Sequence, residues 1–329
     1  MKIFVNDVEN LLVESLSGFA AAHRDLVSLQ LDPHYLTRAK KAVNKVALIS
    51  GGGSGHEPLH TGFIGHGMLD AACPGHVFTS PTPDQMLAAA EAVEAGKGVL
   101  FIVKNYAGDV MNFEMAAEML PFESATVLTS DDVAVENSTW TTGRRGVAGT
   151  VIVEKCVGSL AETGADLAAC KALGDKVNRS TASMGLALSS CTVPAAGRPT
   201  FDIGDGELEM GVGIHGEPGR RREAMRTADE IVADLVSAIL QDLKPAAGSE
   251  VLLMINGFGA TPSMQLYLLY HSAAKLLAAQ GLTISRSLVG NYTTALDMAG
   301  ASVTVCVLDD EIKQHWDSPV QTAALRWGC

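Results

Sequence analysis

Val46-Ala-Leu-Ile-Ser-Gly-Gly-Gly-Ser-Gly-His-Glu-Pro58 is the stretch around which the rest of the chain can be interpreted. Its first residues, 46–49, form a short apolar run that predicts a buried strand. Five small residues follow, and glycine lets a backbone approach a ligand closely. A flexible turn is the alternative, but ligands bind at strand carboxyl ends in open α/β sheets. With His56 at its exit, the run therefore predicts a small-molecule cradle.

A second apolar run, residues 98–103, predicts another strand that is buried on both faces. It too ends in polar groups, among them Lys104 and Asp109. A third strand is predicted at residues 125–129. Because two such strands would deliver ionisable groups to the same edge of a sheet, we expect a site at that edge.

The remaining elements follow from apolar spacing and capping residues. Thr82-Pro83 and Thr261-Pro262 are predicted helix starts, and residues 62–75 are too rich in glycine to be expected as regular structure. Helices are predicted at residues 6–22, 82–95, 110–120, 165–178, 228–243 and 263–279, with one more from about 147 to 162. Further strands are predicted at residues 251–255 and 301–308, and a new structural unit at 184.

Composition limits the class of protein. The 329 residues are enough for about two domains, and 47% hydrophobic with 5% aromatic residues fits α/β layers. A net charge of −13 argues against nucleic-acid binding, which needs a basic surface. The six cysteines form no CxxC pair, and no targeting or membrane-spanning run occurs. We therefore expect a cytoplasmic protein with reduced thiols, no metal and no membrane association.

Two familiar motifs match by letter only. His56-Glu-Pro-Leu-His60 fits the zinc-protease pattern HExxH, but Pro58 is incompatible with the unbroken helix that this chemistry needs. Residues 211–216 fit the dinucleotide pattern GxGxxG, but no helix is predicted to open at the third glycine. No phosphate-binding P-loop sequence occurs.

A set of longer motifs extends over nearly the whole chain: Ser50-Gly-Gly-Gly-Ser-Gly-His-Glu-Pro58, Lys104-Asn-Tyr106 with Gly108-Asp109, Gly143-Arg-Arg-Gly146, Cys191-Thr-Val-Pro-Ala-Ala-Gly197, Gly211-Val-Gly-Ile-His-Gly-Glu-Pro-Gly219, Gly259-Ala-Thr-Pro262 and Trp327-Gly328. Together they resemble the dihydroxyacetone kinase family, in particular the substrate-binding subunits of its phosphotransferase-system-dependent type.

The resemblance implies a fold of two α/β domains and a homodimer. The first domain, residues 1–183, would have a mixed sheet like that of a sugar-phosphotransferase A domain and would carry the cradle. The second, residues 184–329, would be a smaller α/β domain that carries His215.

The resemblance also assigns roles. His215 matches the family's covalent histidine, which adds to the ketone carbon of dihydroxyacetone and gives a hemiaminal. Asp109 matches the base that takes the proton of the hydroxyl to be phosphorylated, and His56 matches a second acid/base residue. The predicted substrate-binding positions are Gly53, Ser54, Gly55, His56, Lys104 and Asp109.

The partners follow from the same resemblance. Single-chain members carry a nucleotide-binding domain after this region, whereas this chain ends at Cys329. We therefore expect no cofactor on this chain, with ADP/ATP and Mg²⁺ on a separate nucleotide-binding subunit. A phosphotransfer subunit would recharge that nucleotide, and a transcription regulator is a further conceivable partner.

Three alternatives stay open at this point. The chain could be a co-activator paralogue that binds dihydroxyacetone and regulates transcription, which needs capture but no base. It could phosphorylate a related short ketose such as erythrulose. A zinc hydrolase that uses His56 and His60 is the third.

Overall fold

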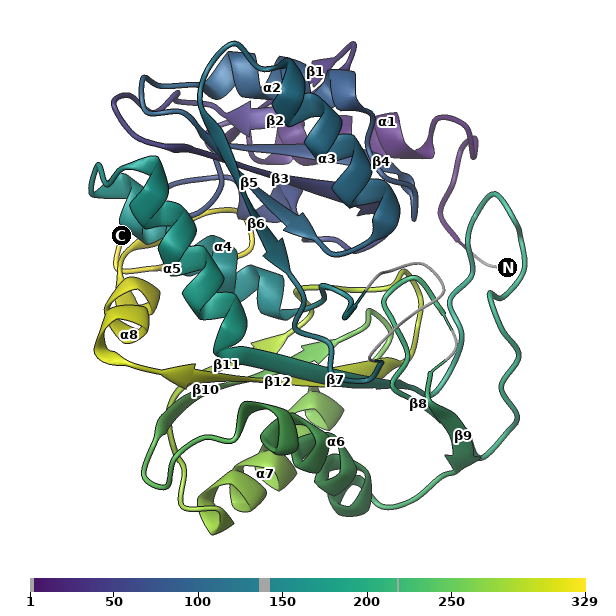
Figure 1. Ribbon diagram of the computed structural model, residues 1–329. Coiled ribbons are helices and arrows are strands. Elements are labelled where there is room, and N and C mark those ends of the chain that lie inside the picture. Colours follow the sequence, from purple (N-terminus) through teal and green to yellow (C-terminus); the bar gives the residue numbers. More distant parts are fainter. Residues whose placement is uncertain (1–2, 136–142, 218) are drawn as a thin grey trace.

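Two mixed β-sheets with a layer of helices between them form the centre of the computed structural model, which describes residues 3–135, 143–217 and 219–329. Further helices cover the outer face of each sheet (Figure 1). The predicted mixed α/β class is confirmed. Because both sheets have helices on either side, their strands can be apolar on both faces.

The first sheet contains the cradle strand. Its order is β1 (Val27–Leu31), β2 (His34–Arg38), β4 (Ala71–Val77), β3 (Ala47–Ser54), β5 (Val99–Lys104) and β6 (Ser124–Thr129). β4, β3, β5 and β6 are parallel, whereas β1 and β2 are antiparallel additions. The carboxyl ends of β3 and β5 therefore reach the same edge, as the sequence predicts.

The second sheet has the order β11 (Thr283–Gly290), β10 (Glu250–Gly257), β12 (Gly300–Leu308), β7 (Thr181–Ala187), β8 (Glu207–Met210) and β9 (Arg221–Ala224). Only the β10–β11 pair is parallel. A short β13–β14 pair, Val320–Gln321 with Arg326–Trp327, lies near the end of the chain.

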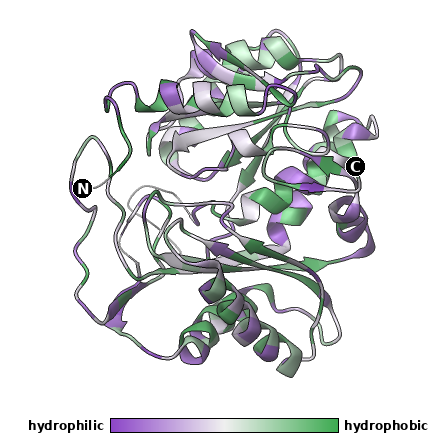
Figure 2. Ribbon diagram, turned by 180° about the vertical axis from the view of Figure 1, so that it is seen from behind, coloured by the Kyte–Doolittle hydropathy of each residue, from purple (hydrophilic) through white to green (hydrophobic). Residues whose placement is uncertain are grey.

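Helices fill three layers. α2 (Pro83–Val93) and α3 (Ala107–Met119) cover the outer face of the first sheet, and α6 (Ala228–Leu243) and α7 (Ser263–Ala279) cover that of the second. α4 (Gly149–Glu162), α5 (Leu167–Arg179) and α8 (Asp310–Asp317) lie between the sheets, and α1 (Leu11–Ala22) packs beside β1. Hydrophobic and hydrophilic residues alternate along the outer helices α6 and α7 (Figure 2).

The central helix α4 is buried over nearly its whole surface. One hydrophobic cluster includes Val151 and Val157 of α4, Leu48 of the first sheet and Leu252 of the second. A helix enclosed on all sides needs an apolar surface all round. The charged residues Glu154 and Lys155 in its centre, which are both 0% exposed, are therefore exceptional.

The capping predictions are confirmed in part. α2 begins at Pro83 behind a capping box of Thr82 and Gln85. At α7 the N-cap residue is Pro262, and the Thr261 hydroxyl instead donates to the Gly300 carbonyl at 2.6 Å. Thr261 therefore joins α7 to β12 and does not cap the helix.

Two predictions of secondary structure are wrong. Residues 62–75 contain most of η1 (Thr61–Phe63) and the greater part of β4, because pairing with β3 and β2 outweighs the weak strand preference of glycine. The first helix starts at Leu11 and not at residue 6, with Asn10 at its N-cap. The predicted domain boundary at 183/184 falls inside β7, and the division itself stays a prediction.

Within the described ranges, no helix combines the length and the apolar character that crossing a bilayer requires.

Candidate active site

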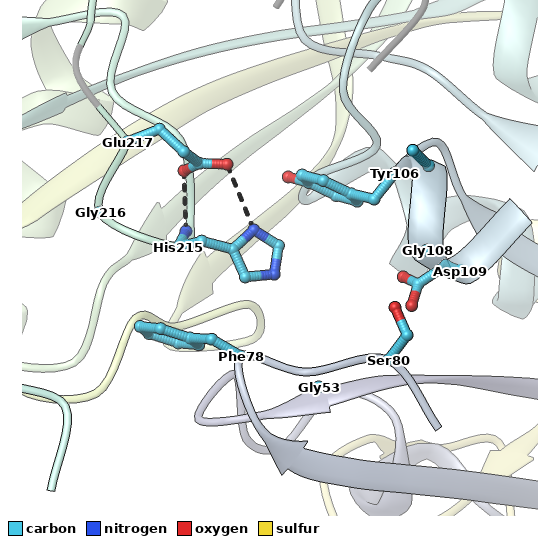
Figure 3. A pocket seen from close by; sticks show the side chains of 10 residues that line it. Gly53, Phe78, Ser80, Tyr106, Gly108, Asp109, His215, Gly216 and Glu217 are labelled. Carbon is cyan, nitrogen blue, oxygen red and sulfur yellow. Dashed lines mark hydrogen bonds and ion pairs between the residues drawn. The ribbon is translucent and has the colours of Figure 1, made fainter. Parts of the chain in front are cut away.

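A cleft of about 500 Å³ opens beside the carboxyl edge of the first sheet. Its walls come from both halves of the chain, since the end of β3, the loops after β4 and β5 and the first turn of α3 face the loop between β8 and β9 (Figure 3). The lining residues are Gly53, Phe78, Ser80, Tyr106, Ala107, Gly108, Asp109, His215, Gly216 and Glu217. A cleft of this size is typical of a small-molecule site.

The floor of the cleft requires glycine at position 53. A Cβ atom there would lie 2.6 Å from the backbone nitrogen of Thr79 and 2.8 Å from the carbonyl carbon of Phe78. The loop after β4 therefore packs directly on the end of β3. This close approach brings the Phe78 ring to the cleft.

His56 lies behind the cleft, 1% exposed, and stacks on Phe78 with ring centroids 5.0 Å apart. Its Nδ1 lies 2.8 Å from the Thr294 carbonyl oxygen, which can only accept, so Nδ1 carries the proton. Nε2 is buried and has no hydrogen-bond partner among the described residues. Burial, together with the charges of His215 and Lys104, holds the pKa of His56 well below 6.5. His56 thus offers a free lone pair from a neutral ring.

His215 faces this ring from the other half of the chain. Its Nδ1 lies 3.3 Å from Glu217 Oε1, and its backbone nitrogen donates to Glu217 Oε2 at 3.0 Å. Burial alone would raise the pKa of Glu217, but the hydrogen bond from His215, the charge of His215 and the Arg145 guanidinium lower it to about 2. An ionised carboxylate can only accept, so Nδ1 of His215 carries the proton. The other nitrogen, Nε2, points into the cleft (Figure 3).

The loop that carries His215 is fixed by a buried arginine. Arg145 is 1% exposed, forms an ion pair with Asp132 at 2.6 Å and donates to the Gly211 carbonyl at 2.8 Å. A Cβ atom at Gly213 would lie 2.2 Å from the Glu217 carboxylate and 2.6 Å from Arg145. Glycine at 213 is therefore needed for the approach of these two charges.

Asp109 and Lys104 lie on the opposite side of the cleft from Glu217. Asp109 is in the first turn of α3, is 3% exposed and points toward the cleft beside Ser80 (Figure 3). Lys104, the last residue of β5, is fully buried, and its Nζ lies 3.7 Å from Asp109 Oδ2. Burial lowers the pKa of Lys104, and the charge of Asp109 counteracts that effect.

The structure brings most of the predicted site residues to one place. Gly53, Asp109 and His215 line the cleft, His56 contacts His215, and Lys104 faces Asp109. Ser54 and Gly55 adjoin them, but the Ser54 hydroxyl donates to the Gly75 carbonyl at 2.7 Å and the Gly55 nitrogen donates to the Glu57 carboxylate at 3.1 Å. The chemical roles of all seven stay predictions.

The two rejected motifs lack the helices that their chemistry needs. Residues 56–60 form turns, so His56 and His60 do not share a helix face. After Gly216 the next regular element is β9, and α6 begins only at Ala228. His60 instead contacts Glu154 and Lys104.

Sequence reasoning missed three aromatic or acidic residues of the site: Phe78, Tyr106 and Glu217. The rings of Tyr106 and Phe78 stand edge-on to His215 at 4.5 and 5.3 Å. Phe78 lies between the predicted irregular residues 62–75 and the predicted helix start at Thr82, so no pattern marked it. Glu217, two residues after His215, could have been found, since a carboxylate that orients a histidine is a common arrangement.

Comparisons with known proteins agree on one family. The model of the Dak1 domain matches residues 17–324. The "PEP-dependent dihydroxyacetone kinase, dihydroxyacetone-binding subunit DhaK" of Escherichia coli is 48% identical, and the match covers 100% of both chains. The "D-erythrulose kinase" of Mycolicibacterium smegmatis is 38% identical over 99% of this chain and 57% of its own. The solved "Dihydroxyacetone kinase operon co-activator Dha-DhaQ" superposes with a TM-score of 0.89 at 32% identity, over 94% of this chain and 97% of its own.

Proposed function

The chain belongs to the dihydroxyacetone kinase family, and from this we propose that it captures dihydroxyacetone on His215 and presents a terminal hydroxyl for phosphorylation by a nucleotide-carrying partner. The observation that carries the proposal is the arrangement of two groups around one cleft. The free Nε2 of His215 points into it from one side and the Asp109 carboxylate from the other (Figure 3). A nucleophile and a base are thus available to opposite parts of one small molecule.

Capture needs a nucleophilic nitrogen and a route for a proton. The Nε2 lone pair of His215 adds to the ketone carbon, and the carbonyl π electrons move to the oxygen. The ring then loses its Nδ1 proton, the alkoxide gains one, and a neutral hemiaminal results. The ionised Glu217 on Nδ1 stabilises the transient positive charge on the ring. The unpartnered Nε2 of neutral His56 is available to a substrate hydroxyl.

Transfer then occurs at a terminal hydroxyl beside Asp109. As the hydroxyl oxygen attacks the terminal phosphorus of ATP on the partner subunit, its proton passes to the Asp109 carboxylate and ADP leaves. The Lys104 ammonium beside Asp109 stabilises negative charge at this end of the cleft. A volume of about 500 Å³ exceeds that of a three-carbon ketose and leaves room for the incoming phosphoryl group.

The wider setting is part of the same proposal. The nucleotide and Mg²⁺ would bind to the partner subunit, and a phosphotransfer subunit would recharge ADP there. The PTS-dependent or PEP-dependent names of the relatives support this order of transfer. Homodimer formation and a cytoplasmic location complete the proposal.

Two relatives define the competing functions. The co-activator superposes closely, but a sensor needs capture without a base, and the buried Asp109 with its Lys104 partner favours transfer chemistry. The erythrulose kinase supports a longer ketose as substrate, for which the cleft has enough volume.

Mixing the chain with a nucleotide-binding subunit of the family, ATP and Mg²⁺ tests the proposal. Dihydroxyacetone phosphate should form in the mixture and not with either component alone. Binding of dihydroxyacetone without product would favour the co-activator, and faster product formation from erythrulose would identify the other ketose. Rapid turnover by the chain alone would contradict the need for a partner.

A further inference from the structure

A line of four buried polar side chains leads from the cleft into the centre of the molecule: Asp109, Lys104, His60 and Glu154. Their exposed fractions are 3%, 0%, 5% and 0%. Lys104 Nζ lies 3.7 Å from Asp109 and 2.9 Å from His60 Nε2, and His60 Nδ1 lies 2.6 Å from Glu154 Oε1. His60 and Glu154 do not line the cleft, so the proposed chemistry does not use them directly.

Burying polar and charged side chains in this way costs folding free energy, which suggests that they are kept for a role in function. Glu154 lies in the middle of α4, which packs between the two sheets, and its Oε2 has no hydrogen-bond partner in the described part of the chain. Burial raises the pKa of Glu154 to about 8, and the Lys104 charge opposes this rise. An apolar residue would suit this position in the core better.

The directions of the hydrogen bonds show which ring nitrogen of His60 carries the proton. The Lys104 ammonium has only donors, so His60 Nε2 must accept from it, and the proton of a neutral His60 must then be on Nδ1. Burial and the nearby Lys104 charge hold the pKa of His60 well below 6.5, which keeps the ring neutral. Glu154 Oε1 accepts this Nδ1 proton, and it can do so whether or not Oε2 carries a proton.

We propose that Glu154 and His60 are positioning residues for Lys104. Glu154 accepts the Nδ1 proton of His60 and so holds the orientation of its ring, and His60 Nε2 together with the Gly51 carbonyl, 3.3 Å from Nζ, takes two of the three ammonium protons. The third is left for Asp109. The resulting effect on turnover rests on the proposed function, whereas the tautomer and the geometry do not.

The tautomer can be measured without any activity assay. In protein labelled with ¹⁵N-histidine, two-bond ¹H–¹⁵N spectra distinguish a ring protonated at Nδ1 from one protonated at Nε2. The His60 signals are assigned as those missing from His60→Gln. The wild type should show a neutral ring with the proton on Nδ1. A proton on Nε2, or a charged ring, in the wild type overturns the proposal, and the His60→Gln spectrum serves only to assign the signals.

Two variants of Glu154 separate positioning from mere packing. Glu154→Gln keeps an acceptor for His60, whereas Glu154→Met is similar in length but has none. With the partner subunit, Glu154→Met should lower kcat/KM about 10- to 100-fold, the effect known for groups that orient a functional histidine. Glu154→Gln should retain most of the wild-type activity and the Nδ1 tautomer.

Ser159→Ala is the matched control. Ser159 is also on α4, and its hydroxyl lies 3.0 Å from the ring nitrogen Nδ1 of another buried histidine, His315, which is not linked to Lys104. This variant should retain kcat/KM and leave the His60 signals unchanged. Equal losses of kcat/KM in Glu154→Met and Ser159→Ala would show that Glu154 acts only through the packing of α4.

Discussion

The imidazole of His215 stands edge-on to that of His56, with ring centroids 4.6 Å apart and planes at 87°. Each ring has its Nδ1 engaged, by Glu217 in one case and by the Thr294 carbonyl in the other. On neither ring does Nε2 hydrogen-bond to another of the described residues. Two imidazoles from different halves of the chain thus stand beside one cleft with this nitrogen left for a ligand, which is the arrangement that our proposal uses for capture.

Replacing Asp109 by Asn should separate capture from transfer. The amide keeps the shape of the carboxylate but accepts no proton, so kcat should fall about 10²- to 10⁴-fold while dihydroxyacetone still binds. Turnover is measured with the nucleotide subunit and binding by calorimetry. Glu114→Gln, an exposed change on the same helix, should retain activity. Normal turnover in Asp109→Asn would exclude this residue as the base.

Glu217→Gln should lower stability in a pH-dependent way. The pKa of Glu217 is about 2 in the folded chain and 4.5 in the unfolded chain, so the unfolded chain binds the proton more readily. The carboxylate therefore adds stability above pH 4.5, of about 3 kcal/mol at most, and this is lost as pH falls toward 2. Urea unfolding should show the variant to be less stable at pH 7, with a difference that shrinks below pH 4.5. A difference that grows on acidification would be the opposite of this expectation.

Gly53→Ala should disturb the cleft through the backbone. The new Cβ would meet the Phe78 and Thr79 main chain below 3.0 Å, so the loop must move and Phe78 leaves its stack on His56. We expect a loss of about 1–3 kcal/mol on unfolding and weaker substrate binding. At Gly18 in α1, no atom of the described residues would lie within 4 Å of an added Cβ, so Gly18→Ala should instead stabilise by about 0.5–1 kcal/mol. Equal thermal shifts in both would refute the steric argument.

Glycerol should be a poor ligand. It has the same three-carbon frame and terminal hydroxyls, so hydrogen bonds from a glycine-lined cradle would discriminate little against it. Only a carbonyl carbon can accept Nε2 of His215, which makes covalent capture a chemical filter. Glycerol should neither compete in the coupled assay nor be phosphorylated. Competition at concentrations close to those of dihydroxyacetone would point to recognition by hydrogen bonds alone.

Local sequence signals were enough for much of the fold. The apolar run before the glycines became β3, the capping residues Thr82 and Pro83 located α2, and Asp109 after β5 reached the cleft. The short strands β1, β2, β8 and β9 were not predicted, because their pairing depends on distant neighbours and not on periodicity.

The site was predictable only in part for the same reason. Gly53, His56, Asp109 and His215 belong to motifs, whereas Phe78 is placed by packing against Gly53. His60 was noticed only as half of a rejected zinc pattern. Glu154 lies next to Lys155 in a mostly apolar helix, and a carboxylate inside such a run is a signal that could have indicated a buried polar network.

Substrate capture as we propose it depends on a covalent bond between His215 and the ketone carbon. Dihydroxyacetone labelled with ¹³C at C2 is bound to ¹⁵N-histidine protein, and the carbon resonance is recorded. We predict a tetrahedral carbon with a one-bond ¹³C–¹⁵N coupling, which the hydrate of free substrate cannot show, and loss of both in His215→Ala. A bound ketone resonance in wild-type protein that still turns over with its partner would contradict the hemiaminal and leave His215 as a positioning residue.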